Sequence, residues 1–453
     1  GSSNTFIGYR AGFGGNSSAP YSSGGDNTAL GYEALNGFTT GYQNVAIGYE
    51  AGESITTGYY NTLMGYEAGE KLTTGFGNVF MGYEAGASKI VNIGSIAIGY
   101  RAGLPSAGSY DVFIGYEAGA QTKGGTSVGI GRGAGRGSNG VTEYGGTSGS
   151  ANTSVGYYAG NYNLGSDNTK IGKEAGFYAT GSYNTFLGSQ AGKGGTTSAP
   201  FSSGERNTAV GYKALQDFTT GEHNVAIGYE AAENITTGNY NTVVGYNAYQ
   251  GATGGSETVS VGYQAGAIAQ GGESVLIGYQ AGYGTSGGSG ANGSWNVAIG
   301  KQALMSQRTG ARRNVAIGYR SLYRLLDNGE DSVAIGYESG LYATGSNNTF
   351  VGKEAGKGGT TSAPYSSGQY NVAVGKSALA SFTTGASNTV LGFAAGASIT
   401  TANQNVAIGE SALAAATNGQ NNVVVGGRAA DAYNGFQSVV IGQDALAGAT
   451  NGY

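Results

Sequence analysis

The stretch Asn44-Val45-Ala46-Ile47-Gly48-Tyr49-Glu50-Ala51-Gly52 decides the fold, because near-copies of it recur along the whole chain. We count 25 copies, the first centred on Gly8 and the last on Gly442, and most successive copies lie 16 to 18 residues apart. Such a period is typical of solenoids, in which each repeat forms one coil and packs only on its neighbours. We name each column of the repeat after its residue in this copy, so that Gly48 stands for the anchor column.

Two aliphatic columns flank one variable column. In all 25 copies the Ile47 column holds Ile, Leu, Val or Met, and the Val45 column holds Val, Thr or Ile. Alternate residues of an extended strand share one face, so this pattern predicts a short strand with both columns facing the interior. The Ala46 column between them varies and even includes Lys170. We therefore expect the face that carries it not to be tightly enclosed.

Three further columns complete the coil. The Asn44 column holds Asn, Ser, Asp or Thr, whose short polar side chains bond the backbone in turns. The Gly48 column suits a bend, or a close backbone approach that a Cβ atom would obstruct. The Ala51 column is Ala in 23 copies, which predicts a contact with room for one methyl group. The sequence thus predicts an all-β parallel β-solenoid of about 25 coils of 16–18 residues, ~120 Å long.

The composition excludes several classes of protein. Glycine supplies 90 of 453 residues and no segment keeps a 3.6-residue apolar period, which argues against helices. The fixed columns are inconsistent with disorder, and 4 prolines without a three-residue glycine period exclude collagen. A net charge of −5 predicts no general attraction to nucleic acid. There is no apolar run long enough for a membrane span, and no Cys for disulfides or thiol chemistry.

A longer period overlies the coils, because 4–58 is closely repeated at 184–238 and again from 348. We expect one continuous solenoid over 1–453. The duplicated blocks are 4–183, 184–347 and 348–453. Some coils are lengthened by insertions, which in solenoids project from one side that is often the binding side. The predicted loops are 13–26, 132–152, 193–205, 279–296 and 357–369. The chain starts without Met and ends part-way through a coil, so we expect either a processed chain or a segment of a longer protein.

The inserted loops supply the candidate contact residues. Three loops contain Ser-Ala-Pro-aromatic-Ser-Ser-Gly, with the aromatic residue at Tyr21, Phe201 and Tyr365. An aromatic ring on a proline-stiffened loop offers a rigid stacking face for a glycan or a neighbouring fibre. The alternative is that these rings fold back over their own coil. The further candidates are Trp295, the only Trp, and Arg312 and Arg313 within a basic cluster that precedes several acidic residues. Those arginines suit either a polyanion or ion pairs on a solvated face.

The predicted interior is thin for one chain. Each coil offers two aliphatic side chains, an Ala and often a Tyr, whereas ordering each residue costs roughly 1–2 kcal/mol of backbone entropy. Packing several solenoids side by side would bury a second apolar face. We therefore expect a parallel homo-oligomer, most simply a trimer. The alternative is a monomer whose core is sealed by a ladder of tyrosines.

The Asn-Val-Ala-Ile-Gly core resembles the head repeats of YadA-type trimeric autotransporter adhesins, which form left-handed parallel β-rolls. The fuller unit at 27–43 resembles repeats of phage tail fibres and bacterial surface fibres, which often precede an intramolecular chaperone domain. The likeness covers essentially the whole chain, although the coil is longer than in the YadA head. It implies a left-handed β-roll, a homotrimer and a role in attachment.

Catalytic chemistry is sparse in this sequence. His223 is the only histidine, which excludes a His-based triad or a multi-His metal site within one chain. We predict no catalytic residue, cofactor or metal, and a structural fibre outside the cell, on the cell surface or on a virion. Its expected partners are copies of itself or filament neighbours, and a cell-surface glycan or receptor. The alternatives are an end-to-end polymerising filament subunit, a polysaccharide-degrading solenoid that uses the Glu50 column, and an ice-binding protein that uses paired threonines.

Overall fold

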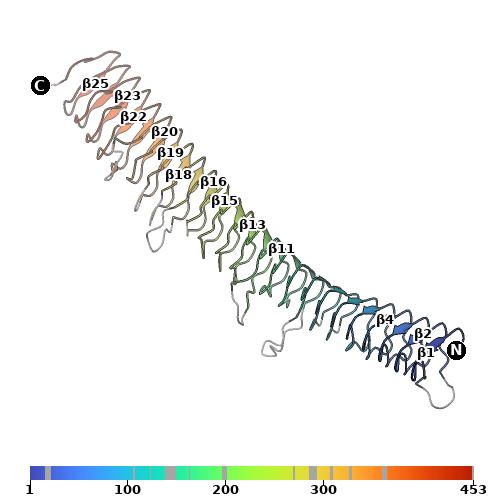
Figure 1. Ribbon diagram of the computed structural model, residues 1–453. Helices are drawn as coiled ribbons and strands as arrows, with labels where there is room; N and C mark the ends of the chain where they lie inside the picture. Colours follow the sequence, from blue (N-terminus) through green and yellow to red (C-terminus); the bar gives the residue numbers. More distant parts are fainter. Residues whose placement is uncertain are drawn as a thin grey trace. The chain divides into compact units, whose positions relative to one another are not determined.

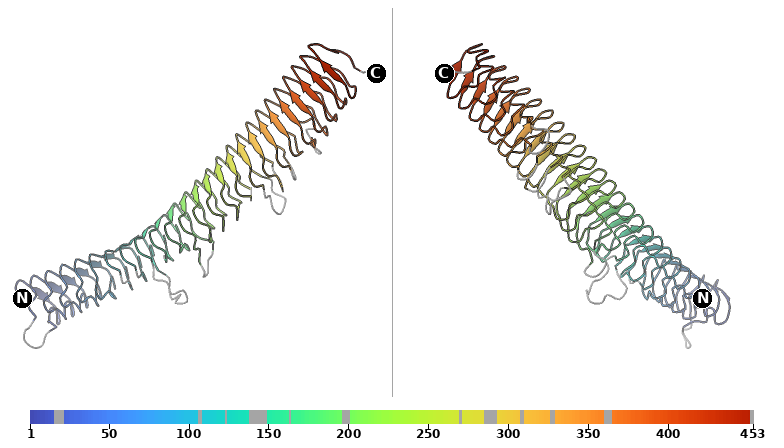
Figure 2. Two further views of the ribbon diagram at one scale, coloured as in Figure 1. Left: turned by 180° about the vertical axis from the view of Figure 1, so that it is seen from behind. Right: turned by 60° about the vertical axis from the view of Figure 1, so that its left-hand side comes forward.

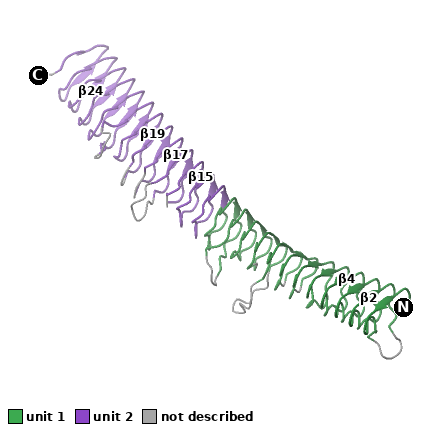
Figure 3. Cartoon of the chain, in the orientation of Figure 1, with its two compact units in different colours: residues 1–224 green, residues 225–453 purple. Residues whose placement is uncertain are grey.

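Each copy of the nonapeptide forms one three-residue strand in the computed structural model. The structure describes residues 1–15, 22–105, 108–122, 124–137, 149–162, 164–195, 201–268, 271–284, 293–306, 310–325, 329–359 and 365–450. These residues contain 25 strands and no helix. The strands belong to two compact units, residues 1–224 and 225–453, which Figure 3 shows in different colours.

Unit 1 is a stack of parallel strands in which each strand pairs with the next one along the chain (Figure 1). The register joins equivalent columns, as in Ala46 opposite Leu63 and Ile47 opposite Met64. Each column therefore recurs at the same place in every coil. The strands are β1 (Thr5–Ile7), β2 (Thr28–Leu30), β3 (Val45–Ile47), β4 (Thr62–Met64), β5 (Val79–Met81), β6 (Ile96–Ile98), β7 (Val112–Ile114), β8 (Val128–Ile130), β9 (Thr153–Val155), β10 (Thr169–Ile171), β11 (Thr185–Leu187) and β12 (Thr208–Val210).

Unit 2 repeats this arrangement, and its strands lie side by side in both views of Figure 2. The predicted all-β parallel β-solenoid is therefore confirmed in each unit. Its strands are β13 (Val225–Ile227), β14 (Thr242–Val244), β15 (Val259–Val261), β16 (Val275–Ile277), β17 (Val297–Ile299), β18 (Val315–Ile317), β19 (Val333–Ile335), β20 (Thr349–Val351), β21 (Val372–Val374), β22 (Thr389–Leu391), β23 (Val406–Ile408), β24 (Val423–Val425) and β25 (Val439–Ile441).

The prediction of which strand face is buried was wrong. In β2–β25 the middle residue is buried and neither flanking residue is. Ala46, Leu63 and Phe80 are completely buried, and so is Lys170, whose presence had suggested an open face. The Val45 and Ile47 columns point outward. β-branched residues favour an extended backbone on either face, so their constancy reports strand formation and not burial.

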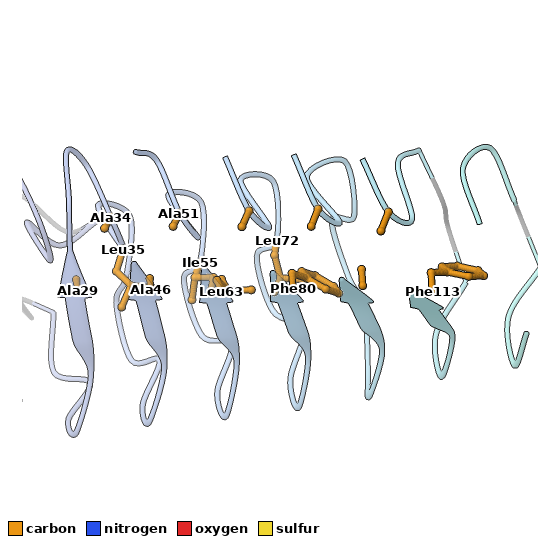
Figure 4. Close-up of a cluster of buried hydrophobic side chains, with 14 of the residues drawn as sticks. Ala29, Ala34, Leu35, Ala46, Ala51, Ile55, Leu63, Leu72, Phe80 and Phe113 are labelled. Atoms are coloured by element: carbon orange, nitrogen blue, oxygen red, sulfur yellow. The ribbon is translucent and has the colours of Figure 1, made fainter. Parts of the chain in front are cut away.

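The core lies between the strands and the returning half of each coil. Figure 4 shows Ala46, Leu63 and Phe80 on the strands, with Ala51 and Ile55 approaching from the opposite wall. All five side chains are completely buried. Beside three of the five lengthened coils, two phenylalanines pack together, with ring centroids 5.6 Å apart in each pair. The sequence-based estimate of a thin interior therefore used the wrong columns. The Val45, Ile47 and Tyr49 columns lie outside the core, and the Ala46 column lies inside it.

The Asn44 column forms a buried hydrogen-bonded ladder along the coils. The Asn44 amide donates to the oxygen of Gly58 at 2.9 Å and to Oδ1 of Asn27 at 3.1 Å. Its own Oδ1 accepts the backbone N–H of Asn61 at 3.1 Å. The column was predicted to make local turn contacts, but its bonds instead connect successive coils. Each asparagine thereby satisfies buried backbone groups at the point where the strand begins.

The anchor glycines allow successive coils to approach closely. Gly48 has φ of 140°, and a Cβ atom placed on it would lie 2.2 Å from the carbonyl oxygen of Gly65. This distance is far inside van der Waals contact. The predicted close backbone approach is therefore confirmed.

The insertions leave the strand register intact. Across three of the predicted loops, Thr5 pairs with Thr28, Thr185 with Thr208, and Thr349 with Val372. After two of the insertions, the chain rejoins the coil at an almost fully buried serine. Ser202 forms a parallel β-bridge with Ala179, and Ser366 forms one with Ala343. Extra residues therefore leave and rejoin the coil without displacing its columns.

Candidate interaction surface

The outward strand residues form an apolar surface along each unit. We define the outer apolar rows as the Val45, Ile47 and Tyr49 columns. Some Ile and Leu residues in these rows are substantially exposed, as for Leu30 at 43% and Ile227 at 39%, and others such as Ile47 are half-buried. Because the strands stack in register, equivalent side chains lie next to one another from coil to coil. The Ile47 column is aliphatic in every coil, whereas the Val45 column also contains Thr, and the Tyr49 column is interrupted by residues such as Lys173, Ser189 and Lys301.

The Tyr49 column adds a stack of aromatic rings to these rows. Tyr49 lies 5.0 Å from Tyr32 and 5.0 Å from Tyr66 between ring centroids, with each pair of planes within 6°. Each ring nevertheless remains about two-fifths exposed. Stacking holds the rings in a fixed orientation, so little side-chain entropy remains to be lost on contact with a partner. The stacks are Tyr9, Tyr32, Tyr49, Tyr66, Tyr83, Tyr100 and Tyr116 in unit 1, and Tyr229, Tyr246, Tyr263 and Tyr279 in unit 2.

Two tyrosines of this stack, Tyr49 and Tyr66, remain uncharged to a higher pH than an ordinary tyrosine. A hydrogen bond from the Tyr49 hydroxyl to the neighbouring Glu50, together with burial and nearby negative charge, raises the pKa of Tyr49 to about 12. The equivalent bond to Glu67 raises the pKa of Tyr66 to about 12. Some charged residues beside the rows form ion pairs between neighbouring coils. Nε of Arg101, for example, lies 2.7 Å from Oε2 of Glu84. The rows are therefore apolar at their centre and polar at one margin.

The two described loop aromatics lie against rings of preceding coils. Phe201 is half-buried, and its ring centroid lies 4.5 Å from that of Tyr162. Tyr365 is half-buried and stacks on Tyr342 at 6.2 Å, within 7° of parallel. Both rings fold back onto the solenoid, but onto earlier coils and not onto their own as the alternative had it, so only part of each ring is accessible. Tyr21, the third candidate, lies outside the described residues.

The remaining candidates face outward and have partners within the chain. Trp295 is 48% exposed, and its indole N–H donates to the carboxylate of Glu273. Arg312 and Arg313 contact Glu330 at 3.1 and 2.6 Å, and Arg313 also contacts a neighbouring aspartate, Asp331, at 2.6 Å. The bond from Arg313 lowers the pKa of the Asp331 carboxyl. The structure thus brings the two arginines together, but it pairs them with acids of the next coil.

Three glutamates form the acidic cluster that comes closest to a metal-ligand set among the described residues. Glu50, Glu53 and Glu70 each present a carboxylate oxygen, all within 4.8 Å of one another. Burial and the neighbouring carboxylates raise the pKa of Glu53, and burial is the largest cause of the raised pKa of Glu70. All three side chains are partly exposed. The sequence did not indicate this cluster, because Glu53 and Glu70 lie outside the column that repeats Glu.

Two buried charged sites were also missed. Lys170 is fully buried, donates to the oxygen of Ala179 at 2.9 Å, and has a pKa that burial lowers to about 7. Lys89 and Asp111 form an ion pair whose side chains are 1% and 0% exposed. A sequence signal existed for Asp111, the one Asp in a column of Asn, Ser and Thr. No signal placed Lys89 beside it.

Comparison with protein-family models and with curated proteins gave no match to this chain. Within the described residues, no helix has the length and apolar character needed to cross a lipid bilayer. The fold class, a parallel β-solenoid with outer apolar rows, therefore provides the basis for a functional proposal.

Proposed function

We propose that this protein is a structural fibre, outside the cell or on a virion, whose copies associate side by side through the outer apolar rows. Its role is attachment and mechanical reach, and not catalysis. The observation that carries the proposal is the outward-facing Ile47 column, aliphatic in every coil and at least partly exposed, together with the runs of stacked, exposed tyrosines beside it. Contiguous exposed apolar surface of this kind marks a protein-protein contact site.

A second copy of the chain is the partner that fits these rows best. The rows repeat with the spacing of the coils, so a parallel copy presents the same column at the same height, with an aliphatic residue in the Ile47 column at every step. Aliphatic residues alternate with stacked rings, which supplies both the buried area and the rigidity that stable interfaces use. Closed cyclic symmetry buries such rows in all copies at once. We propose a parallel homotrimer, because the repeat resembles the head repeats of trimeric adhesins.

The attachment role is assigned to the candidate aromatic residues in and beside the insertions. Trp295 and the exposed parts of Phe201 and Tyr365 present aromatic surface near the insertions. Such rings stack on the apolar faces of sugars, so a cell-surface glycan or glycosylated receptor is the proposed ligand class. Arg312 and Arg313 contribute less to this role, because Glu330 and Asp331 already neutralise them.

Electron microscopy of the purified full chain tests the assembly. We expect discrete particles that each contain several chains. Continuous filaments would support end-to-end polymerisation instead, and single-chain particles would contradict side-by-side association.

A pair of triple variants tests the surface involved. Ile47→Lys, Met64→Lys and Met81→Lys together place three charges in the outer apolar rows, where each position is only partly buried. Thr40→Lys, Thr57→Lys and Thr74→Lys place the same charges at exposed bends of neighbouring coils. We expect the first variant to dissociate the particles and the second to leave them intact. Equal behaviour of the two variants would contradict the proposed interface.

A further inference from the structure

Lys89 and Asp111 occupy an unusual position in the core of unit 1. Lys89 follows β5 and stands in the column of Ile55, whereas Asp111 precedes β7 and stands in the column of Asn44. Their side chains are 1% and 0% exposed, and Nζ lies 3.5 Å from Oδ2. An amine and a carboxyl from different coils are therefore in contact where water is excluded.

We propose that Lys89 and Asp111 condense to form an intramolecular isopeptide bond between successive coils. The lone pair of the neutral Nζ adds to Cγ of the protonated carboxyl, so that a C–N bond forms. An amine proton then passes to the departing hydroxyl, the C–O bond breaks, and one water leaves. Atoms and charge balance, no electron is transferred, and no cofactor or oxidant is required.

The surroundings favour the neutral partners that this reaction needs. Burial lowers the pKa of Lys89, and burial raises the pKa of Asp111, although each partner's charge opposes the shift of the other. Both shifts move the pair from ammonium and carboxylate toward amine and carboxylic acid. Proton transfer from Nζ to Oδ2 needs no intervening group at their separation of 3.5 Å.

The hydrogen bonds around the pair suit attack on Cγ. The backbone N–H of Ser127 donates to Oδ1 of Asp111 at 3.0 Å, where it would stabilise the negative charge that develops on the oxygen. Oδ2 has no hydrogen-bond partner among the described residues, which leaves it as the departing oxygen. Nζ of Lys89 donates to the carbonyl oxygen of Gly108 at 2.8 Å. That bond fixes the position of the amine beside the carboxyl.

A covalent bond accounts for a pair that is otherwise costly. Buried ion pairs recover their desolvation only with very good geometry, and this one has a long contact and an unpartnered oxygen. The chain has no cysteine and therefore no disulfide, and an amide is a covalent link that joins coils without one. The inference does not rest on the proposed function, because it concerns one chain alone.

Intact mass spectrometry of the denatured full chain tests the bond. We expect a mass about 18 Da below that of the sequence, equal to one lost water. Proteolysis should yield one branched peptide that joins the segments around Lys89 and Asp111, which separates this bond from water loss elsewhere. A wild-type chain at its full sequence mass, or a deficit without the branched peptide, would overturn the proposal.

Matched variants locate the bond. Lys89→Arg retains the positive charge but cannot form this amide, and Asp111→Ala removes the carboxyl, so both should have the full mass of their own sequences. Lys170→Met removes a different buried lysine and should retain the deficit. A deficit that persists in Lys89→Arg would also contradict the assignment. The wild-type mass and its peptides decide the question even if a variant does not fold.

Discussion

At the scale of single residues, the anchor glycines set the distance between coils. Gly409 has φ of 131°, and a Cβ atom there would lie 2.5 Å from the carbonyl oxygen of Gly426. We expect Gly409→Ala to destabilise unit 2 by roughly 3 kcal/mol or more, because it combines backbone strain with a backbone clash. Gly427→Ala is the matched control, since nothing lies within 4 Å of the added Cβ. Denaturant midpoints followed by circular dichroism should separate the two, and equal midpoints would contradict the role of the anchor.

The buried Lys170 predicts a pH-dependent stability. Burial lowers its pKa to about 7 in the folded chain, whereas the unfolded chain retains the ordinary value near 10.5. The unfolded state therefore binds more protons between these values, and stability rises with pH across that window. Lys170→Met should stabilise unit 1 at pH 7 by roughly 2–4 kcal/mol, an advantage that shrinks toward pH 10. Thermal unfolding of both proteins at pH 7 and pH 10 measures this stability difference. A difference that does not change with pH would exclude the lowered pKa of Lys170 as its cause.

Residues at tight or bent positions were predictable, and buried polar groups were not. The Gly48 and Ala51 columns are fixed by steric contact, and a steric limit leaves a visible mark when it repeats 25 times. Lys89 and Lys170 are single departures from their columns. The burial and partners of these two lysines depend on side chains of neighbouring coils. The residue types within one column do not identify those neighbours.

At the scale of the element, the side chains of the Asn44 column hydrogen-bond neighbouring coils at the point where each strand begins. Removing one amide leaves several buried groups without partners, including the Asn61 N–H and the Gly58 oxygen. Asn44→Ala should therefore destabilise unit 1 by roughly 2–4 kcal/mol. Thr40→Ala, at an exposed bend nearby, should change stability by less than about 0.5 kcal/mol. Urea unfolding measures both, and a neutral Asn44→Ala would show that the ladder contributes little.

The strands themselves were predictable, but the direction of their faces was not. Alternation fixes which columns share a face, and the parallel stack follows from the repeat. The burial of Ala46 depends on where the rest of the coil returns, which alternation does not specify. Because the constant aliphatic columns proved to be external, the candidate surface shifted from the insertions to the scaffold itself.

At the scale of the whole molecule, the outer apolar rows are the central feature to explain. The interior of each coil is filled by its own middle-column, alanine and leucine or phenylalanine side chains, so the case for an oligomer no longer rests on a thin core. It rests instead on outward-facing aliphatic residues that recur in every coil and on runs of stacked tyrosines beside them.

The mass of the purified chain in solution, measured by light scattering over a range of concentrations, tests this claim most directly. The account predicts an integral multiple of the 45.2 kDa chain mass, with three chains as the expected value. The triple lysine variant of the outer rows should return to the mass of one chain. A wild-type mass of 45.2 kDa at all concentrations would contradict the account.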